Sequence, residues 1–279
     1  MEEVCNTIIL GIKDYFRKNN FKKAVIGLSG GVDSSVSACI TAKALGNRNV
    51  TGILMPHSST TSRGSIDDAK NLAAMIGIKI HLVSLDDFAG NFKKISSDFL
   101  DSENYRNALS YSLANVKARL RMIILYCFAN LNNALVIGTS DKSEIALGYT
   151  TKYGDNAADI MVIGDLWKTE VIELARRLRL PSSIIIKEPS AELVEGQTAE
   201  KELGAPYEIL DRILKMQIID GLSTTEIVKR GMKPKIVRNV LERIRLNEHK
   251  RRSPPIIRLS ERSFHSMEWR MPITNGFRS

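Results

Sequence analysis

The sequence predicts an α/β fold: a doubly wound five-stranded parallel sheet followed by a helical C-terminal part. Short runs rich in β-branched apolar residues alternate with amphipathic stretches up to residue 165. Such alternation is typical of a parallel sheet covered by helices on both faces. After residue 165 the pattern is helical. We expect a single domain over residues 1–279, with an α/β core over 20–165 and a helical extension over 166–279.

The predicted strands and helices can be placed one after another along the chain. The expected strands span residues 24–28, 50–55, 78–83, 134–138 and 160–163. The expected helices span residues 33–45, 65–76, 86–100 and 112–131, and then 168–179, 207–217, 224–230 and 235–247. Residues 189–204 form a polar stretch, and a loop of this length is more often functional than merely connecting. Ligands bind such sheets outside the carboxyl ends of the strands, so the residues after each strand are the candidates for a site.

Composition limits the function classes. The chain has 43% hydrophobic and 25% charged residues, as ordinary globular proteins have, and its apolar stretches are too short to span a bilayer. No secretory signal is visible at the N-terminus, and the three cysteines follow no metal-binding or redox spacing. We therefore expect a cytoplasmic protein without a membrane partner.

The net charge of +9 is concentrated near the C-terminus. Residues 230–279 carry 13 Lys and Arg against 4 Asp and Glu. Such an excess suits nucleic acid, and it suits a polyanionic small molecule equally well. Aromatic residues are sparse in this segment, so a surface for base stacking is not indicated. The charge alone leaves both partners open.

A glycine-rich loop follows the first predicted strand. Residues 24–35 read Ala-Val-Ile-Gly-Leu-Ser-Gly-Gly-Val-Asp-Ser-Ser, and the two adjacent glycines let consecutive N–H groups face one oxyanion. The helix that begins near Asp33 adds the positive end of its dipole. A carboxylate beside a phosphate is repulsive unless a cation lies between them, so Asp33 predicts a bridging Mg²⁺. An ordinary capped turn is the structural alternative.

The loop differs from a Walker A loop because no Gly-Lys-Ser/Thr ending is present. A Walker lysine serves the β and γ phosphates. Its absence fits a site that holds pyrophosphate as a leaving group, with cleavage between the α and β phosphates of ATP.

The predicted strand at 134–138 also ends in a glycine, and a hydroxyl residue follows it. Thr139, Ser140 or Asp141 can cap the helix that begins there. Glu144 lies where it can reach toward Asp33, and two carboxylates around a triphosphate suit Mg²⁺. A first-turn acid on a helix dipole is the alternative interpretation of Glu144.

Several basic residues have two interpretations. Lys117 and Arg121 lie four apart on one helical face, where a solvated surface is the favoured explanation. Lys152 lies in a turn with two acids, which indicates a substrate loop or a plain turn equally. Lys168 opens a helix although a cation there opposes the dipole, and this suggests that it reaches a ligand. His249 follows the last helix, where a charged helix end is the ordinary explanation.

Taken together, these motifs resemble those of the ammonia-dependent NAD synthetase family, within the ATP pyrophosphatase (PP-loop) superfamily. The motifs occur in the family's order and cover about residues 24–252. They are Ser29-Gly-Gly-Val-Asp-Ser34, Asn115-Val-Lys-Ala-Arg-Leu-Arg-Met122, Gly138-Thr139 with Glu144, Thr151-Lys-Tyr-Gly-Asp155, Lys187-Glu-Pro-Ser-Ala-Glu-Leu193 and Glu248-His-Lys-Arg251. The implied fold is adenine nucleotide alpha hydrolase-like.

The resemblance implies that the chain is a ligase that amidates deamido-NAD (nicotinic acid adenine dinucleotide) with ammonia to NAD. The reaction passes through an acyl-adenylate and releases AMP and pyrophosphate. Mg²⁺ is the implied metal, ATP the co-substrate and a homodimer the assembly. The length of the chain leaves no room for a glutaminase domain, which favours free or delivered ammonia.

The same resemblance assigns residues. Asp33 and Lys168 are implied to be catalytic, and Asp33 and Glu144 to hold Mg²⁺. The implied ATP-binding residues are Gly27, Leu28, Ser29, Gly30, Gly31, Val32, Asp33, Ser34, Thr139, Lys168 and Ser190. The implied deamido-NAD-binding residues are Arg119, Lys152, Asp159, His249 and Lys250.

Two other functions stay open at this point. A tRNA-modifying enzyme of the same superfamily is favoured by the basic C-terminal segment, but the lack of paired cysteines weighs against thiolation and the dinucleotide motifs weigh against both thiolation and amination. A non-catalytic nucleotide sensor would need no precise metal site, and the pair Asp33 and Glu144 weighs against it. We therefore expect no nucleic-acid partner.

Overall fold

The computed structural model describes residues 1–96, 105–190, 192–194, 196, 198–264, 269 and 271–273. At its centre lies a five-stranded sheet in the order β3-β2-β1-β4-β5, with every neighbouring pair parallel. The strands are β1 (Lys23–Gly27), β2 (Val50–Leu54), β3 (Lys79–Leu82), β4 (Ala134–Gly138) and β5 (Ile160–Met161). The predicted five-stranded parallel sheet is confirmed, although the last strand is two residues shorter than expected.

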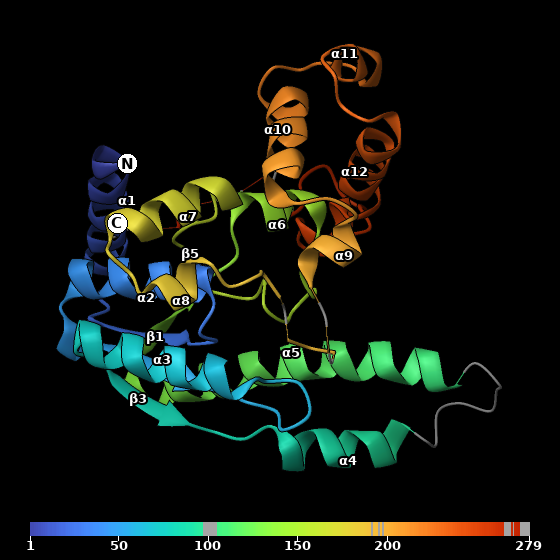
Figure 1. The fold of residues 1–279 in the computed structure, drawn as a ribbon. Coiled ribbons are helices and arrows are strands. Elements are labelled where there is room, and N and C mark those ends of the chain that lie inside the picture. The colour runs from blue at the N-terminus through green and yellow to red at the C-terminus, as the bar shows by residue number, and fades with distance from the viewer. Residues whose placement is uncertain are drawn as a thin grey trace.

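Helices cover both faces of this sheet (Figure 1). In the first part of the chain they are α1 (Glu2–Lys18), α2 (Val32–Leu45), α3 (Arg63–Ile76), α4 (Asp86–Ser96), α5 (Tyr105–Asn132) and α6 (Lys142–Leu147), with a short 3₁₀ turn η1 (Asn47–Asn49). In the second part they are α7 (Lys168–Arg177), α8 (Ser182–Ile185), α9 (Ala199–Leu203), α10 (Tyr207–Ile218), α11 (Thr224–Lys229) and α12 (Pro234–Leu246), followed by the 3₁₀ turn η3 (Glu248–Lys250).

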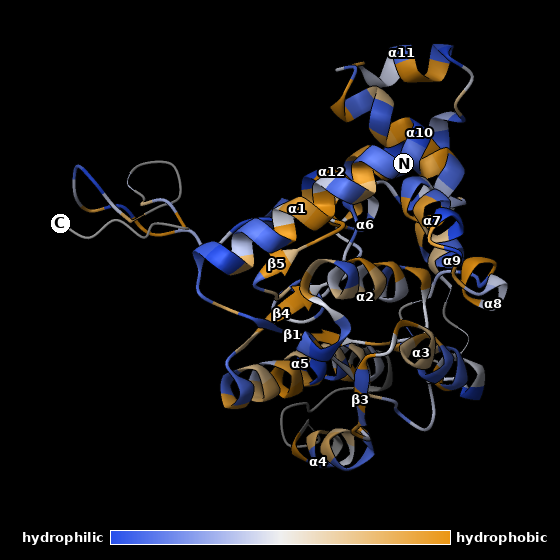
Figure 2. Ribbon diagram, turned by 90° about the vertical axis from the view of Figure 1, so that its left-hand side faces the viewer, coloured by the Kyte–Doolittle hydropathy of each residue, from blue (hydrophilic) through white to orange (hydrophobic). Residues whose placement is uncertain are grey.

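The strand β1 is buried on both faces, as its continuous apolar sequence predicts. Alternate residues enter different cores because successive side chains of a strand point to opposite faces. Ala24 and Ile26 pack with α1, α2, α3 and α7, whereas Val25 packs with α5. Figure 2 shows α1 and α2 on one side of the sheet and α4 and α5 on the other. The doubly wound arrangement is therefore confirmed.

The C-terminal helices form a third apolar cluster beside the sheet. Its buried residues include Leu210 and Leu214 of α10 and Val237 and Val240 of α12. α6 and α7 also contact α10, so this cluster is joined to the sheet through the segment that follows β4. The helical character of the second part is confirmed, and the division of the chain at residue 165 stays a prediction.

Within the described part of the chain, three helices lie outside the predicted set: α1, α8 and α9. α1 buries Ile12 and Phe16 against the sheet-covering helices. α9 lies inside the stretch 189–204 that we expected to be a loop, so that expectation is wrong for its residues. Thr198 caps α9 by accepting a hydrogen bond from the Lys201 amide at 3.4 Å. The end of the predicted helix 86–100 falls outside the described residues, and no helix that the structure describes is long and apolar enough to cross a membrane.

Candidate active site

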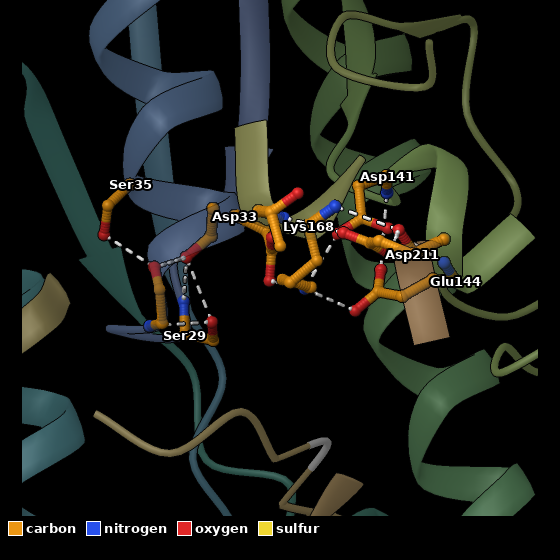
Figure 3. A network of polar contacts seen from close by, with 11 residues as sticks. Ser29, Asp33, Ser35, Asp141, Glu144, Lys168 and Asp211 are labelled. Carbon is orange, nitrogen blue, oxygen red and sulfur yellow. Dashed lines mark hydrogen bonds and ion pairs between the residues drawn. The ribbon is translucent and has the colours of Figure 1, made fainter. Parts of the chain in front are cut away.

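The glycine loop, residues 28–34, follows β1, includes the first turn of α2 and is braced by its own hydroxyl groups. Ser29 Oγ accepts a hydrogen bond from the Gly31 amide at 3.2 Å. Ser34 Oγ accepts from the Ser29 amide at 3.3 Å and donates to the Gly31 carbonyl at 3.1 Å. Ser35 Oγ donates to the same carbonyl at 2.7 Å (Figure 3). These contacts fix the loop at the start of a helix, where backbone N–H groups suit an anion.

Gly30 is required by the geometry of the loop. Its φ of +77° lies in the left-handed region, which side chains other than glycine disfavour. A Cβ at this position would lie 2.2 Å from the Ser65 carbonyl oxygen in the first turn of α3. The glycine therefore permits both the turn and the close packing of the loop against α3.

A cavity of about 280 Å³ opens beside the glycine loop. It is bounded by the carboxyl ends of β1, β2 and β4, by one face of α5 and by residues 187–190, 192 and 193. The predicted site residues that line it are Gly27, Leu28, Ser29, Gly31, Val32, Asp33, Ser34, Thr139, Glu144 and Ser190. Gly30 and Lys168 are not part of this lining. The structure thus gathers most of the predicted ATP-binding residues around one cavity.

Lys168 lies at the centre of a cluster of three carboxylates. Its side chain is fully buried, and Nζ lies 2.7 Å from Asp33 Oδ2, 2.9 Å from Asp141 Oδ2 and 2.9 Å from Glu144 Oε1 (Figure 3). The ammonium also lies 5.1 Å from the centre of the Tyr207 ring. The predicted pair of Asp33 and Glu144 is therefore brought together, but through a lysine that sits between them.

The electrostatics of this carboxylate cluster follow from burial and mutual attraction. Burial alone lowers the pKa of Lys168, but Asp141, Asp33 and Glu144 outweigh it, so the pKa lies well above its ordinary value. Burial raises the pKa of Asp141 to about 6, against the opposing effect of the Lys168 ammonium. Burial likewise raises the pKa of Glu144 well above its usual range. Lys168 is therefore a firmly held cation among carboxylates that resist ionisation.

Asp141 has two tasks, and the sequence indicated only the first. As the N-cap of α6, its Oδ1 accepts from the Glu144 amide at 2.8 Å, and Glu144 Oε2 accepts from the Asp141 amide at 3.4 Å. Asp141 is thus the residue that caps this helix. Its other oxygen faces Lys168. Asp141 is fully buried, which is unusual for a helix-capping acid and indicates its second task, the contact with Lys168. This burial cannot be inferred from the local sequence.

Asp211 of α10 fixes the segment that carries Lys168. It is buried and accepts from Ser143 Oγ at 2.5 Å and from the Thr169 amide at 2.9 Å. Ser143 Oγ in turn accepts from the Lys168 amide at 2.9 Å. The first turn of α7 is therefore tied to α6 and to α10. Nothing in the local sequence pointed to Asp211.

The carboxylate cluster suits a divalent cation. One oxygen from each of Asp33, Asp141 and Glu144 lies within 4.8 Å of the others. Asp33 Oδ1 is buried and has no hydrogen-bond partner among the described residues. The three side chains offer carboxylate oxygens, and oxygen ligands of this kind suit Mg²⁺. The residues present therefore fit the implied metal.

The five residues implied to bind deamido-NAD lie outside the cavity lining. Arg119 Nε donates to the Lys152 carbonyl at 3.3 Å, which brings two of them together. Lys250 Nζ donates to backbone carbonyls near the end of α6, at 2.7 and 2.8 Å. Asp159 accepts from the Val136 amide at 2.7 Å, so it braces β4. His249 lies on η3 next to Lys250.

Two basic residues of α5 contradict the expectation of a solvated face. Lys117 is 7% exposed and donates to the Leu193 carbonyl. Arg121 lines the cavity. The signal for this inward face was present in the apolar spacing of Ala118, Met122 and Leu125, which line the same cavity.

Lys187 joins three parts of the site, a contact not anticipated from the sequence. Its Nζ donates to the Gly30 carbonyl at 3.3 Å, to Ser65 Oγ at 3.0 Å and to Asp68 Oδ2 at 3.0 Å. Ser65 Oγ donates to Glu192 Oε1 at 2.5 Å. The segment after α8 is thereby held against both the glycine loop and α3.

Comparisons with known proteins agree with this geometry. A family model described as NAD synthase matches residues 4–254. An NH(3)-dependent NAD(+) synthetase of Saccharolobus solfataricus is 43% identical over 97% of this chain and 94% of its own length. A glutamine-dependent NAD(+) synthetase of Thermotoga maritima is 42% identical over 99% of this chain, which spans only 48% of that relative.

Solved structures with the same fold include two that this chain covers almost completely. An NMN synthetase from Francisella tularensis has a TM-score of 0.79 and 30% identity, with 92% of this chain and 98% of that one covered. An NH3-dependent NAD synthetase from Campylobacter jejuni has a TM-score of 0.74 and 30% identity over the same shares. With its glycine loop and its carboxylate cluster on one cavity, the chain belongs to the NAD synthase family.

Proposed function

We propose that this chain catalyses the ATP-dependent amidation of deamido-NAD by ammonia, with release of AMP and pyrophosphate. The observation that carries this proposal is the single cavity onto which the glycine loop, Thr139 and the acidic residues Asp33 and Glu144 all open. Such a cavity offers backbone donors for phosphate oxygens beside carboxylates for a phosphate-bound cation. Family membership supports the same reaction.

The chemistry proposed has two displacements. The nicotinate carboxylate attacks the α phosphorus of ATP, an O–P bond forms, and pyrophosphate leaves with the electrons of the broken bond. Ammonia then attacks the acyl carbon of the resulting acyl-adenylate, AMP leaves with the electrons of the broken C–O bond, and the nitrogen loses one proton to give the amide. Both steps depend chiefly on positioning and on neutralising charge, so a dedicated acid–base pair is not needed.

The chain's own residues have separate roles in this scheme. The N–H groups of the glycine loop hold the phosphates, and Thr139 and Ser190, which line the same cavity, contact ATP. Lys168, which is fully buried and lies outside the cavity lining, supplies a fixed positive charge among the three carboxylates. Asp33 and Glu144 would hold Mg²⁺, which when bound neutralises phosphate charge and helps pyrophosphate to leave.

The nitrogen donor is proposed to be ammonia itself. Its support is similarity: the NH(3)-dependent relative of Saccharolobus solfataricus is 43% identical over 97% of this chain. A turnover assay with either ammonium or glutamine separates the two donors. We expect NAD with ammonium and none with glutamine, and turnover with glutamine alone would refute the assignment.

A second candidate substrate is the mononucleotide, nicotinic acid mononucleotide. Its support is the NMN synthetase of Francisella tularensis, which matches this fold with a TM-score of 0.79. The two substrates differ by the adenylate half of the dinucleotide. Competition between equal concentrations of both therefore decides between them, and the dinucleotide proposal requires a kcat/KM at least roughly tenfold higher for deamido-NAD, a difference of about 1.4 kcal/mol in transition-state binding.

A homodimer with the dinucleotide at the subunit interface is part of this proposal. Arg119, Lys152 and His249 lie outside the cavity lining, as residues that serve a shared site would. Exposed apolar side chains on α4 and α5, Phe88 and Ile123 among them, offer a surface for a second copy. Light scattering after size exclusion tests this assembly, and a monomer at micromolar concentration would refute it.

The predicted absence of a nucleic-acid partner and the predicted cytoplasmic location stay predictions. Retention of tRNA on the purified protein, measured against salt concentration, tests the first. Asp33→Asn tests the sensor alternative. If the chain is an enzyme, this substitution should abolish ATP turnover, whereas a sensor has no turnover to lose. Unchanged ATP cleavage in that variant would remove the Mg²⁺ assignment.

A further inference from the structure

Arg121 is a half-buried cation on an otherwise apolar wall of the cavity. Ala118, Arg121, Met122 and Leu125 lie at positions i, i+3, i+4 and i+7 of α5, so they share one helical face, and all four line the cavity. Burial lowers the pKa of Arg121 from its ordinary value. A charged group placed on such a wall is unfavourable unless it has a partner.

The protein itself leaves most of the guanidinium without hydrogen bonds. Of its five N–H donors, Nε donates to the Met55 carbonyl at a long 3.4 Å. Among the residues that the structure describes, neither Nη group has an acceptor, and no carboxylate lies within ion-pair distance of Arg121. The open donors border the cavity, where a ligand would meet them.

Two carboxylates lie near enough to affect Arg121 electrostatically, and both are held elsewhere. Asp155 Oδ1 accepts from the Thr151 amide at 2.7 Å. Glu192 Oε1 accepts from Ser65 Oγ at 2.5 Å. Their charges raise the pKa of Arg121 but do not outweigh its burial. They balance part of the charge without occupying the planar pair of Nη donors.

We propose that Arg121 binds an oxyanion of the substrates through its Nη groups, as a binding residue of this cavity beyond the glycine loop. The ligand chemistry is a pair of adjacent oxygens on one atom, as in a phosphate or a carboxylate, which matches the fork of a guanidinium. ATP and the nicotinate dinucleotide both carry such groups, so the inference rests on the proposed function for the identity of the ligands. It does not require turnover.

The test compares ligand binding to three variants of the intact chain by isothermal titration calorimetry. Arg121→Met removes the charge and all five donors, and Arg121→Lys keeps the charge but loses the fork. Arg177→Met is the matched control, because this exposed arginine pairs only with Glu2 on the far helix α1 among the described residues. The ligands are ATP, deamido-NAD and NAD, each added alone.

We expect Arg121→Met to weaken at least one ligand by roughly 10- to 100-fold, the range for lost hydrogen bonds to a charged group. Arg121→Lys should recover only part of that loss, and the control should bind like wild type. A loss confined to ATP assigns the anion to its phosphates. A loss for deamido-NAD but not for NAD assigns it to the nicotinate carboxylate, and an equal loss for both dinucleotides assigns it to their phosphates.

Binding of all three ligands within twofold of wild type by both Arg121 variants would overturn the proposal, as would a wild-type protein that binds none of them. Arg121→Lys keeps the length and charge of the side chain, so it provides a folded comparison if Arg121→Met loses its structure. If the wild-type enzyme forms no NAD, the proposed function is refuted but the proposal for Arg121 is not. The loss of ATP affinity in Arg121→Met is measured without turnover.

Discussion

Replacement of Lys168 by methionine tests whether this residue is the cation that makes the carboxylate cluster tolerable. Lys168 Nζ lies within 2.9 Å of oxygens from Asp33, Asp141 and Glu144, and its side chain has no exposed surface. Methionine preserves length and apolar packing but removes the charge. Three acidic groups are then left together in a buried site without a compensating cation.

The expected loss in the free energy of unfolding is about 3–5 kcal/mol, the usual cost of removing one partner from a buried ion pair. For a chain of this size each kcal/mol lowers the unfolding temperature by about 2–4 °C, so the midpoint should fall by about 6–20 °C. Added Mg²⁺ should recover part of the loss, because a ligand that binds only the folded state stabilises it.

The measurement is urea unfolding in EDTA and again with Mg²⁺, with the slope against urea compared between variants. Lys142→Met is the matched control. Lys142 forms a surface pair with Asp165 at 2.7 Å, and Asp165 is 95% exposed, so its loss should cost less than about 1 kcal/mol. A loss for Lys168→Met no larger than for this control, or the same loss with and without Mg²⁺, would refute the reasoning.

Three further changes have defined outcomes. Gly30→Ala forces a side chain into a left-handed φ of +77° and places its Cβ 2.2 Å from a backbone oxygen. It should lower the free energy of unfolding by at least about 1–2 kcal/mol and weaken ATP binding. The control Gly11→Ala, in the open middle of α1, should raise the free energy of unfolding by up to about 1 kcal/mol. Urea unfolding checks both, and equal effects would contradict the geometry. Asp211→Asn keeps the shape but loses charge-assisted acceptance from two donors, and should cost about 1.5–3 kcal/mol; unfolding at an unchanged urea midpoint would count against it. Hydrogen bonds, first from Ser84, lower the pKa of Asp86 to about 2; its contribution to stability is therefore present above pH 4 and lost as the pH falls through 2. At pH 6, Asp86→Asn should be less stable than wild type by under about 1 kcal/mol, a small value because the side chain is 43% exposed. The unfolding curves of the two proteins should converge near pH 2. A difference in stability that grows on acidification would contradict this account.

The sheet was predictable because its strands are signalled locally. The run at β1 is apolar on both faces and ends in glycines, and β4 repeats the same pattern. The sequence signal for α1 is of the same local kind, since Ile8, Ile12 and Phe16 lie on one helical face with four-residue spacing. α9 is only five residues long and lies between polar stretches, so no periodicity reveals it.

The sequence predicted the part of the site in which backbone N–H groups of one short loop bind the ligand. It did not predict the contacts between residues that lie far apart in the chain. The glycine loop carries its conformation in its own sequence. The contact between Lys168 and Asp33 joins residues 135 positions apart, and Asp211 reaches α7 from a later helix. Arg121 faces inward because α5 packs with one face on the sheet. A basic residue in a helical sequence does not by itself indicate whether its face of the helix is covered.

The central claim is that this cavity activates a carboxylate by attack on the α phosphate of ATP, and an isotope experiment tests it most directly. Deamido-NAD labelled with ¹⁸O in both carboxylate oxygens is turned over with ATP, Mg²⁺ and ammonium, and the ¹⁸O content of each product is measured by mass spectrometry. We predict NAD, AMP with one ¹⁸O and pyrophosphate with none, because one carboxylate oxygen stays on phosphorus when the amide forms. AMP without label, or label in pyrophosphate, would contradict the account.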